Sequence, residues 1–187
     1  MNIFVLHTDP QVAASYLCDK HINKMIVESA QMLANCFTEQ DLQRAPRTQS
    51  GNVRKHSFKH HPCSKWVLAS SENAMWLVRH ALAMDDQRYF AASRGDLCKY
   101  KEHFCIPFIR WCLNQFLQDK HICGNCVQTP FTYAIGPTTN AAQHPSFDQL
   151  DTVGKYRLYY QLDKPFATWK NRHVPHWYNQ TTNITAA

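Results

Sequence analysis

The stretch from Cys18 to Gln31, CDKHINKMIVESAQ, decides how this chain is expected to fold. Apolar residues in and after it recur every three or four positions, which is the spacing of one buried face of an α-helix. They are Ile22, Met25, Ile26, Met32, Leu33 and Phe37. A second stripe with the same spacing, which we call the polar ridge, comprises His21, Lys24, Glu28, Gln31 and Asn35. The helix is therefore expected to be anchored by one face, with the ridge either in water or directed into a site.

Two interpretations of the polar ridge are open. Lys24 and Glu28 are four residues apart, so they could form an ordinary surface ion pair worth roughly 0.3–0.5 kcal/mol. Alternatively, Glu28 is a partly buried carboxylate among cations, where it could act as a general base or stabilise positive charge on a sugar or an imine. We favour the second interpretation, with His21 and Lys24 beside Glu28, and we expect Asp19 to cap the helix.

The rest of the chain also carries helical signals. Asp9 and Pro10 are a typical start for a short helix over residues 11–17. Further helices are expected from Cys63 to about Ala92, around Phe104–Phe116 with Pro107 at its start or at a kink, and from about Ser146 to Asp163. Only five of 187 residues are glycine, which argues against a β-sandwich or barrel rich in tight turns. We therefore predict a mainly α fold, a compact single-domain helical bundle with long loops over residues 1–187.

The composition limits the classes of function. Twenty Lys and Arg residues against fourteen acids give a formal net charge of +6 with His neutral. That balance permits binding to nucleic acid or phosphate without proving it. No secretion signal and no apolar window of about 20 residues occurs, so no membrane partner is expected. The eight cysteines are then expected to be reduced thiols in a cytoplasmic compartment.

Residues 38–62 lack sustained periodicity and are expected to form a basic loop or insertion. We call the part from 54 to 61, RKHSFKHH, the basic segment; its cations are Arg54, Lys55, His56, Lys59, His60 and His61. Such a run of charge is either a solvated surface or a patch that contacts phosphates, where each neutralised phosphate steepens the salt dependence of binding. We favour phosphate contact.

Residues 164–187 form a basic and aromatic C-terminal segment that is broken by proline. Its candidate DNA contacts are Trp169, Lys170, Asn171, Arg172, Trp177 and Tyr178. Aromatic faces stack on bases or sugars while cations meet phosphates. The alternative is a strap whose tryptophans fill the core and whose cations reach the solvent, and the two interpretations can hold for different residues.

A partial metal motif occurs in HICGNC, which offers His121, Cys123 and Cys126. It resembles half of a zinc site but lacks a second half with Cys-x-x-Cys or His-x-x-x-His spacing. We therefore assign no metal or other cofactor, and structural zinc at Cys123 and Cys126 stays an open alternative. The zinc deaminase signature is incomplete and no phosphate-cradling glycine loop occurs, which disfavours deaminases, kinases and Rossmann enzymes.

Three blocks of the sequence resemble a group of small phage proteins associated with pyrimidine-dimer DNA glycosylases of the endonuclease V type. The blocks are the opening MNIFVL with the following DKH, KM and AQML, then HHPCSKWV with NAMWL, and finally ATWKNRHVPHWY. The resemblance implies a mainly helical, endonuclease V-like fold. It also implies that the enzyme flips a pyrimidine nucleotide out of the duplex, attacks the sugar C1′ with the N-terminal amine and uses one glutamate near the imine.

The resemblance assigns roles to particular residues. Asp19, Lys20 and His21 followed by Glu28 match the family's first block, which makes Glu28 the implied catalytic glutamate. Trp177 and Tyr178 are implied to lie beside the DNA. The predicted catalytic candidates are therefore Glu28, Lys24, His21 and Met1, and the predicted DNA contacts are Lys20, the cations of the basic segment and the six candidates of the C-terminal segment.

The start of the chain departs from the family pattern. Asn2 follows Met1, and a bulky second residue usually leaves the initiator Met in place, so the reactive amine would be that of Met1. Two other functions stay open for this reason. The same scaffold could transfer an amine or an amino acid, as co-substrate, to an activated 5-hydroxymethyl pyrimidine in DNA, with Glu28 as the base. It could also be a non-enzymatic DNA- or protein-binding phage module. DNA is the expected partner, and the cytoplasm of an infected host cell is the expected location.

Overall fold

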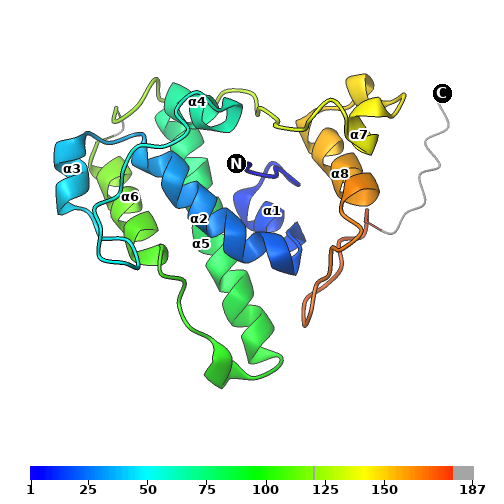
Figure 1. Cartoon of the computed structure of the whole chain (residues 1–187), viewed down its shortest axis with the longest axis horizontal. Coiled ribbons are helices and arrows are strands. Elements are labelled where there is room, and N and C mark those ends of the chain that lie inside the picture. Colours follow the sequence, from blue (N-terminus) through cyan, green and yellow to red (C-terminus); the bar gives the residue numbers. More distant parts are fainter. Residues whose placement is uncertain (120, 179–187) are drawn as a thin grey trace.

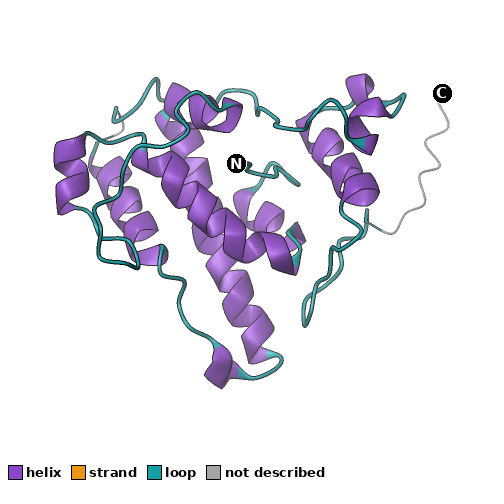
Figure 2. Ribbon diagram, in the orientation of Figure 1, coloured by secondary structure: helices purple, strands orange, loops and turns teal. Residues whose placement is uncertain are grey.

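The computed structural model describes residues 1–119 and 121–178. Within those ranges the chain forms α1 (Pro10–Tyr16), α2 (Asp19–Ala34), α3 (Glu39–Arg44), α4 (Pro62–Ala69), α5 (Ser71–Ser93), η1 (Leu97–Lys99), α6 (Ile106–Gln118), α7 (Asn140–Gln143), η2 (Phe147–Gln149) and α8 (Thr152–Asp163) (Figure 1). The described residues hold no strand, only an isolated bridge of Ser70 with Gly124 and Asn125 (Figure 2). The prediction of a mainly α fold is confirmed. No helix in this part of the chain is both long and apolar enough to cross a membrane.

Helix α5 is the axis of the fold, because α1, α2, α4 and α6 all pack against it. In Figure 1, α2 crosses in front of α5, and α7 and α8 lie on the opposite side of the N-terminus from α3 and α6. The apolar stripe of α2 is buried throughout, as predicted, and the extended N-terminal residues 3–6 are buried with it. Burying each large apolar side chain stabilises the fold by roughly 1.5–3 kcal/mol. The core therefore fixes both α2 and the start of the chain.

Three helix boundaries differ from the sequence-based expectations. Residues 38–62 are not loop throughout, because α3 begins in a capping box in which Thr38 and Asp41 satisfy each other's backbone N–H groups. The helix expected from Cys63 to Ala92 is two helices, since Ser70 is extended and its hydroxyl accepts the N–H of Glu72 to start α5. The last helix begins at Thr152, not near Ser146, because Asp151 caps it.

Two further expectations concern caps. Helix α6 begins at Ile106, with Pro107 in its first turn, so the proline starts the helix and does not kink it. Asp19 is not the cap of α2, because Cys18 occupies that position. Instead, Asp19 accepts hydrogen bonds from the Oγ1 of Thr168, the N–H of Lys170 and the Nη2 of Arg172. Asp19 thus ties residues 164–178, which we call the C-terminal strap, to the start of α2.

Candidate active site

The polar ridge of α2 faces the beginning of the chain. Glu28 is 9% exposed, and its Oε2 accepts the backbone N–H of Asn2 at 2.7 Å. The same oxygen lies 3.8 Å from the α-amino group of Met1. A carboxylate is therefore held next to a primary amine at the rim of the core, which is the arrangement expected if the ridge is directed into a site.

The side chain of Asn2 holds the N-terminus in this position. Its Oδ1 accepts the N–H groups of Ile3 and Phe4 and the hydroxyl of Tyr156, while its Nδ2 donates to the carbonyl of Ala134 at 2.9 Å. All of its hydrogen-bonding atoms are used within the fold, so the amine of the preceding residue is positioned by α8 and by the loop that contains Ala134.

Met1 is exposed through its backbone although its side chain is anchored. Met1 as a whole is half-buried, but its side chain is only 3% exposed, so the atoms that water reaches are backbone atoms. The hydroxyl of Ser64 lies 3.5 Å from the Sδ of Met1. The side chain therefore acts as an anchor in the core, and the partly exposed backbone of Met1 carries the amine that lies 3.8 Å from Glu28.

Backbone strain occurs next to this amine. Phe4 has a φ of 44°, a left-handed conformation that is uncommon for a bulky residue and is typical of sites where the surrounding structure enforces it. Its ring stacks on that of His21 with 4.4 Å between centroids, and the Nδ1 of His21 makes a short hydrogen bond with the hydroxyl of Tyr160. Burial, with smaller contributions from Lys164 and Lys24, lowers the pKa of His21 to about 4. At neutral pH His21 is therefore an uncharged residue that orders the site, and not a cation beside Glu28.

Lys24 supplies a cation to the outer side of Glu28. Its Nζ lies 3.6 Å from Oε1, and its side chain is 68% exposed. The ordinary i,i+4 ion pair therefore exists, but it joins a solvated lysine to a buried carboxylate. Since solvent screens the lysine, the pair contributes little to stability. The Oε2 of Glu28 therefore faces the amine of Met1, and its Oε1 faces Lys24 at the surface.

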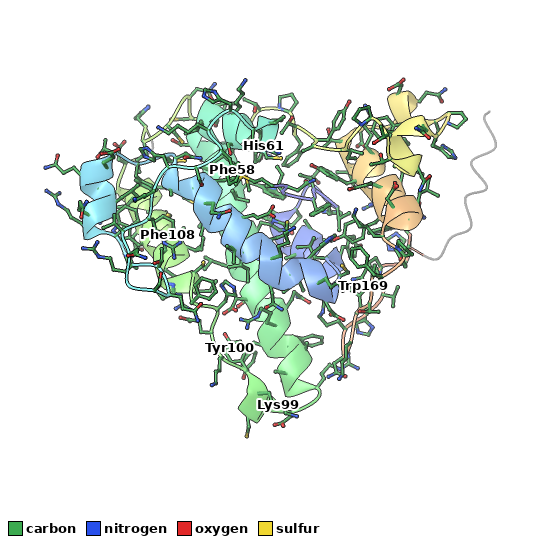
Figure 3. All side chains as sticks on the ribbon, in the orientation of Figure 1. Phe58, His61, Lys99, Tyr100, Phe108 and Trp169 are labelled. Atoms are coloured by element: carbon green, nitrogen blue, oxygen red, sulfur yellow. The ribbon has the colours of Figure 1, made fainter. Side chains whose placement is uncertain are left out.

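His61 also belongs to this site. It is the N-cap residue of α4, and its Nδ1 accepts the N–H of Cys63, so the neutral ring carries its proton on Nε2. Burial and the nearby N-terminal amine lower the pKa of His61, while Glu28 opposes that shift. Figure 3 shows His61 above α2, at the start of α4. In this tautomer the lone pair of Nδ1 is occupied and Nε2 is a donor, so His61 is a neutral hydrogen-bond donor near the N-terminus.

The basic segment is divided between surface and core. Lys55, Lys59 and His60 are exposed, whereas Arg54 is 9% exposed and lies over the ring of Phe108. Asn35 of the polar ridge holds the segment, since its side chain bonds both the N–H and the carbonyl of Ser57. The exposed part of the predicted patch therefore comprises two lysines and His60, whereas Arg54 lies beneath the surface against Phe108.

The C-terminal strap packs against the fold. Trp169 and Trp177 are buried, and their rings are not accessible for stacking on a base in this conformation. Arg172 is also buried, while Lys170 and Asn171 are exposed and line a groove of about 460 Å³ between α2 and the end of α5. The arrangement supports the alternative of a strap. Lys170, Asn171 and the half-buried Tyr178 remain candidates for DNA contact, as does the exposed Lys20, whose Nζ lies 4.6 Å from the ring centroid of Phe166.

The cysteines of the partial zinc motif have different partners. The Sγ of Cys123 contacts the carbonyl of Val67 and the hydroxyl of Ser71, whereas the Sγ of Cys126 lies 3.4 Å from the Nδ1 of His121. Within residues 1–119 and 121–178 no three His, Cys, Asp or Glu side chains are grouped as metal ligands would be. Structural zinc thus stays an open alternative, for which the described residues offer no group of three ligands.

Sequence reasoning missed three residues of this region. Asn2 and Tyr156 position the amine, and Phe58 is an exposed aromatic residue in the basic segment. A polar residue that opens an apolar run, as Asn2 does before IFVL, is the signal that could have indicated a buried polar anchor. Tyr156 gave no such signal, because its place on α8 is consistent with ordinary core packing.

Comparison with known proteins bears on the first half of the chain. Residues 1–88 match the family model described as pyrimidine dimer DNA glycosylase. The first 88 residues therefore resemble that family, and they include Met1, the whole of α2 and the basic segment. No curated protein and no solved structure matches the chain.

Proposed function

We propose that this protein is a DNA glycosylase with AP-lyase activity that acts on a pyrimidine nucleotide through its N-terminal amine. The observation that carries the proposal is the 3.8 Å separation of the Met1 amine from the buried carboxylate of Glu28. The family match over residues 1–88 supports it, because that region contains both groups. DNA is the substrate that such a function implies.

The proposed chemistry begins when the amine loses a proton and attacks C1′ of a flipped nucleotide. A carbon–nitrogen bond forms at C1′, the glycosidic bond breaks, and its electron pair leaves with the base, which takes up a proton. Opening of the sugar ring gives an iminium between the amine nitrogen and C1′. Removal of a proton from C2′ then allows the 3′ phosphate to leave, which cuts the strand.

The surroundings of the amine suit each step. Glu28 can stabilise the positive charge of the iminium at close range, because water screens a buried carboxylate less than an exposed one. The proton of the amine is lost to solvent, and His61, which is uncharged at neutral pH because its pKa is lowered, adds no positive charge that would oppose the iminium. Burial raises the pKa of the neighbouring Cys63 to about 11, so that thiol is protonated at neutral pH and is not a competing nucleophile.

Borohydride trapping tests the proposal. The protein would be incubated with duplexes that carry an abasic site, a thymine dimer or a modified pyrimidine, and the reaction would be reduced with borohydride. Intact mass and peptide mapping would show whether an adduct forms and whether its nitrogen belongs to Met1. Glu28→Gln should lose the strand cleavage, whereas Glu102→Gln, which removes an exposed carboxylate paired with Arg110, should not.

The other outcomes have defined meanings. An adduct on a lysine side chain would reject the N-terminal amine as the nucleophile. A gain of mass on the DNA when amino acids are supplied, without strand cleavage, would favour the amine-transfer alternative. Tight DNA binding with neither reaction, and unchanged in Glu28→Gln, would favour a binding module.

A further inference from the structure

A groove of about 1100 Å³ lies beside the polar ridge. It runs between α2, α3, the loop of residues 48–57 and the two residues just before α6, Phe104 and Cys105. Gln31 lines it and also belongs to the polar ridge, so the groove is a lateral neighbour of the Glu28 site. Figure 1 shows the loop between α3 and α4 running alongside α2 over this part of the molecule.

Arg54 lines the groove and is a buried cation without an acidic partner. Its side chain is covered by the ring of Phe108, 4.4 Å from guanidinium carbon to ring centroid, and its Nη2 donates to the Sγ of Cys105 at 3.7 Å. Its Nε has no hydrogen-bond partner among the described residues, and no carboxylate of those residues lies within 4 Å of it. Figure 3 labels Phe108 at the side of α6 toward this loop.

The contrast with another buried arginine is informative. Arg172, which is buried to the same degree, donates to the carboxylate of Asp19 and to the carbonyls of Leu17 and Ser15. A guanidinium stays charged at all physiological pH values and carries five donors. A buried charge is expensive unless it is paired and hydrogen-bonded. The thiol of Cys105 and the aromatic face of Phe108 offset only part of the free-energy cost of burying the charge of Arg54.

The other residues that line the groove indicate which kind of ligand could pair with Arg54. Lys55 lines it as a cation, and Gln31, Gln43 and Asn52 add neutral amides, against the single carboxylate of Glu39. The hydroxyl of Ser57, also in the groove wall, is buried without a hydrogen-bond partner. Guanidinium, ammonium, amide and hydroxyl donors around one cavity match the several acceptor oxygens of a phosphate group. We propose that this groove is a phosphate-binding site in which Arg54 is the central donor.

Two sources of phosphate fit this chemistry. One is a backbone phosphate of the DNA strand, in which case the inference deepens the proposed function. The other is a free phosphorylated small molecule, which would make the groove a separate site. Phosphate binding can be measured without catalysis. The phosphate site can therefore be rejected while the proposed function stands, and the proposed function can be rejected while the phosphate site stands.

Thermal unfolding in the presence of inorganic phosphate and of pyrophosphate would test the site, with sodium chloride at matched ionic strength as reference. Ligand in large excess over its Kd should raise the Tm of the wild type by roughly 5 °C, and Arg54→Met should lose that shift. Methionine keeps apolar contact with Phe108, so without phosphate the Tm of Arg54→Met should equal or exceed that of the wild type. Arg110→Met, which removes an exposed arginine from α6, should retain the phosphate shift.

DNA titrations would separate the two sources. If the phosphate belongs to DNA, Arg54→Met should reduce the slope of log Kd against log salt concentration by about one. If it belongs to a small molecule, the slope should stay unchanged while the shift with phosphate or pyrophosphate is lost. A lower Tm of Arg54→Met without phosphate, together with equal phosphate shifts in both proteins, would overturn the proposal and leave Arg54 as a packing residue.

A separate observation concerns Phe58 at the tip of the basic segment. Phe58 is 64% exposed, and its φ of 52° is unfavourable for a bulky residue. Hydrogen bonds hold the chain on both sides, since Asn35 binds Ser57 and the N–H of His61 donates to the carbonyl of Phe58. Figure 3 places Phe58 next to His61 above α2. A strained and well-held segment thus projects an apolar ring into solvent, with Lys59 and His60 beside it.

We infer that Phe58 enters the duplex as an apolar wedge next to the nucleotide that is flipped out. This inference rests on the proposed function. Apolar side chains that insert between base steps unstack them, and exposed cations on either side would hold the flanking phosphates. Strained backbone that the surrounding hydrogen bonds enforce is characteristic of functional sites, and here the strain directs the ring outward.

Comparison of duplex and single-stranded substrates would test the wedge. Phe58→Ala should cut the abasic lyase rate on duplex DNA by about tenfold or more, but by less than about twofold on a single strand, where no stack needs to be opened. Phe58→Trp, which keeps a large aromatic side chain, should retain the wild-type rate on duplex DNA. Leu117→Ala is the matched control, because Leu117 is equally exposed at 64% on α6. Equal losses on both substrates would overturn the wedge, whereas absence of activity in the wild type would instead reject the proposed function.

Discussion

Glu28 fastens the beginning of the chain to α2, because its Oε2 accepts the N–H of Asn2 at 2.7 Å and lies 3.8 Å from the amine of Met1. One carboxylate therefore has two tasks, to hold the N-terminus and to face the amine that we propose as nucleophile. Because Glu28 is buried, its substitution is expected to cost some stability as well as activity.

Glu28→Gln should reduce the single-turnover rate on an abasic duplex by at least about 100-fold, because the iminium loses its counter-charge. The amide oxygen of glutamine can still accept the N–H of Asn2, so the free energy of unfolding should fall by only about 1–2 kcal/mol. Rates and urea unfolding would be measured on the same preparation. A wild-type rate in a folded Glu28→Gln protein would contradict the assignment.

Arg172→Met should destabilise the protein by about 2–4 kcal/mol, because it removes the guanidinium that donates to two backbone carbonyls and to the Oδ1 of Asp19. Urea unfolding would measure the loss. Lys170→Met is the control, since only the backbone N–H of Lys170 bonds to Asp19. If Arg172→Met instead keeps its stability and weakens DNA binding, the C-terminal strap contacts DNA and is not primarily structural.

The exposed lysines of the basic segment should contribute to binding through salt-dependent contacts with phosphates. Replacing Lys55 and Lys59 together with methionine should lower the slope of log Kd against log salt by about two and should change unfolding by less than about 0.5 kcal/mol. Fluorescence anisotropy over a range of salt concentrations would measure it. Lys101→Met, at an exposed position outside the segment, should leave the slope unchanged.

The helices that could be predicted are those with strong local signals. Asp9 and Pro10 begin α1 as expected, and the two stripes of α2 separate core from site. Helix α3 has only six residues, too few to show a period, although Thr38 and Asp41 form a capping box in sequence as well as in space. Ser70 breaks the α4–α5 stretch because the loop at Gly124 packs against it, which local sequence does not show.

Long-range packing explains what could not be predicted about the site. The inward direction of Glu28 followed from the ridge, but its contact with Asn2 required the fold. Arg54 looked like one more cation of a surface run, because the ring that covers it, Phe108, is far away in sequence. Trp177 looked equally suited to a base or to the core, and only the packing of the C-terminal strap decided for the core.

His80 should make the protein sensitive to acid. It is fully buried on α5 beside Trp76, neither ring nitrogen has a hydrogen-bond partner among the described residues, and burial lowers its pKa to about 3. The unfolded chain therefore binds a proton at a higher pH than the folded one. Stability is fully present above the ordinary pKa of 6.5 and is lost, at about 1.4 kcal/mol per pH unit, as the pH falls from 6.5 toward 3.

His21, with its pKa lowered to about 4, adds a loss of the same sign. Between pH 6.5 and 5.0 the two histidines together should lower the free energy of unfolding of the wild type by about 3 kcal/mol. In His80→Phe the loss should be about half as large, because only His21 then contributes. Urea unfolding at the two pH values would measure both proteins, with His173→Gln, at an exposed position, as a control that keeps the wild-type dependence. An unchanged pH dependence in His80→Phe would show that His80 is not the group that protonates on unfolding.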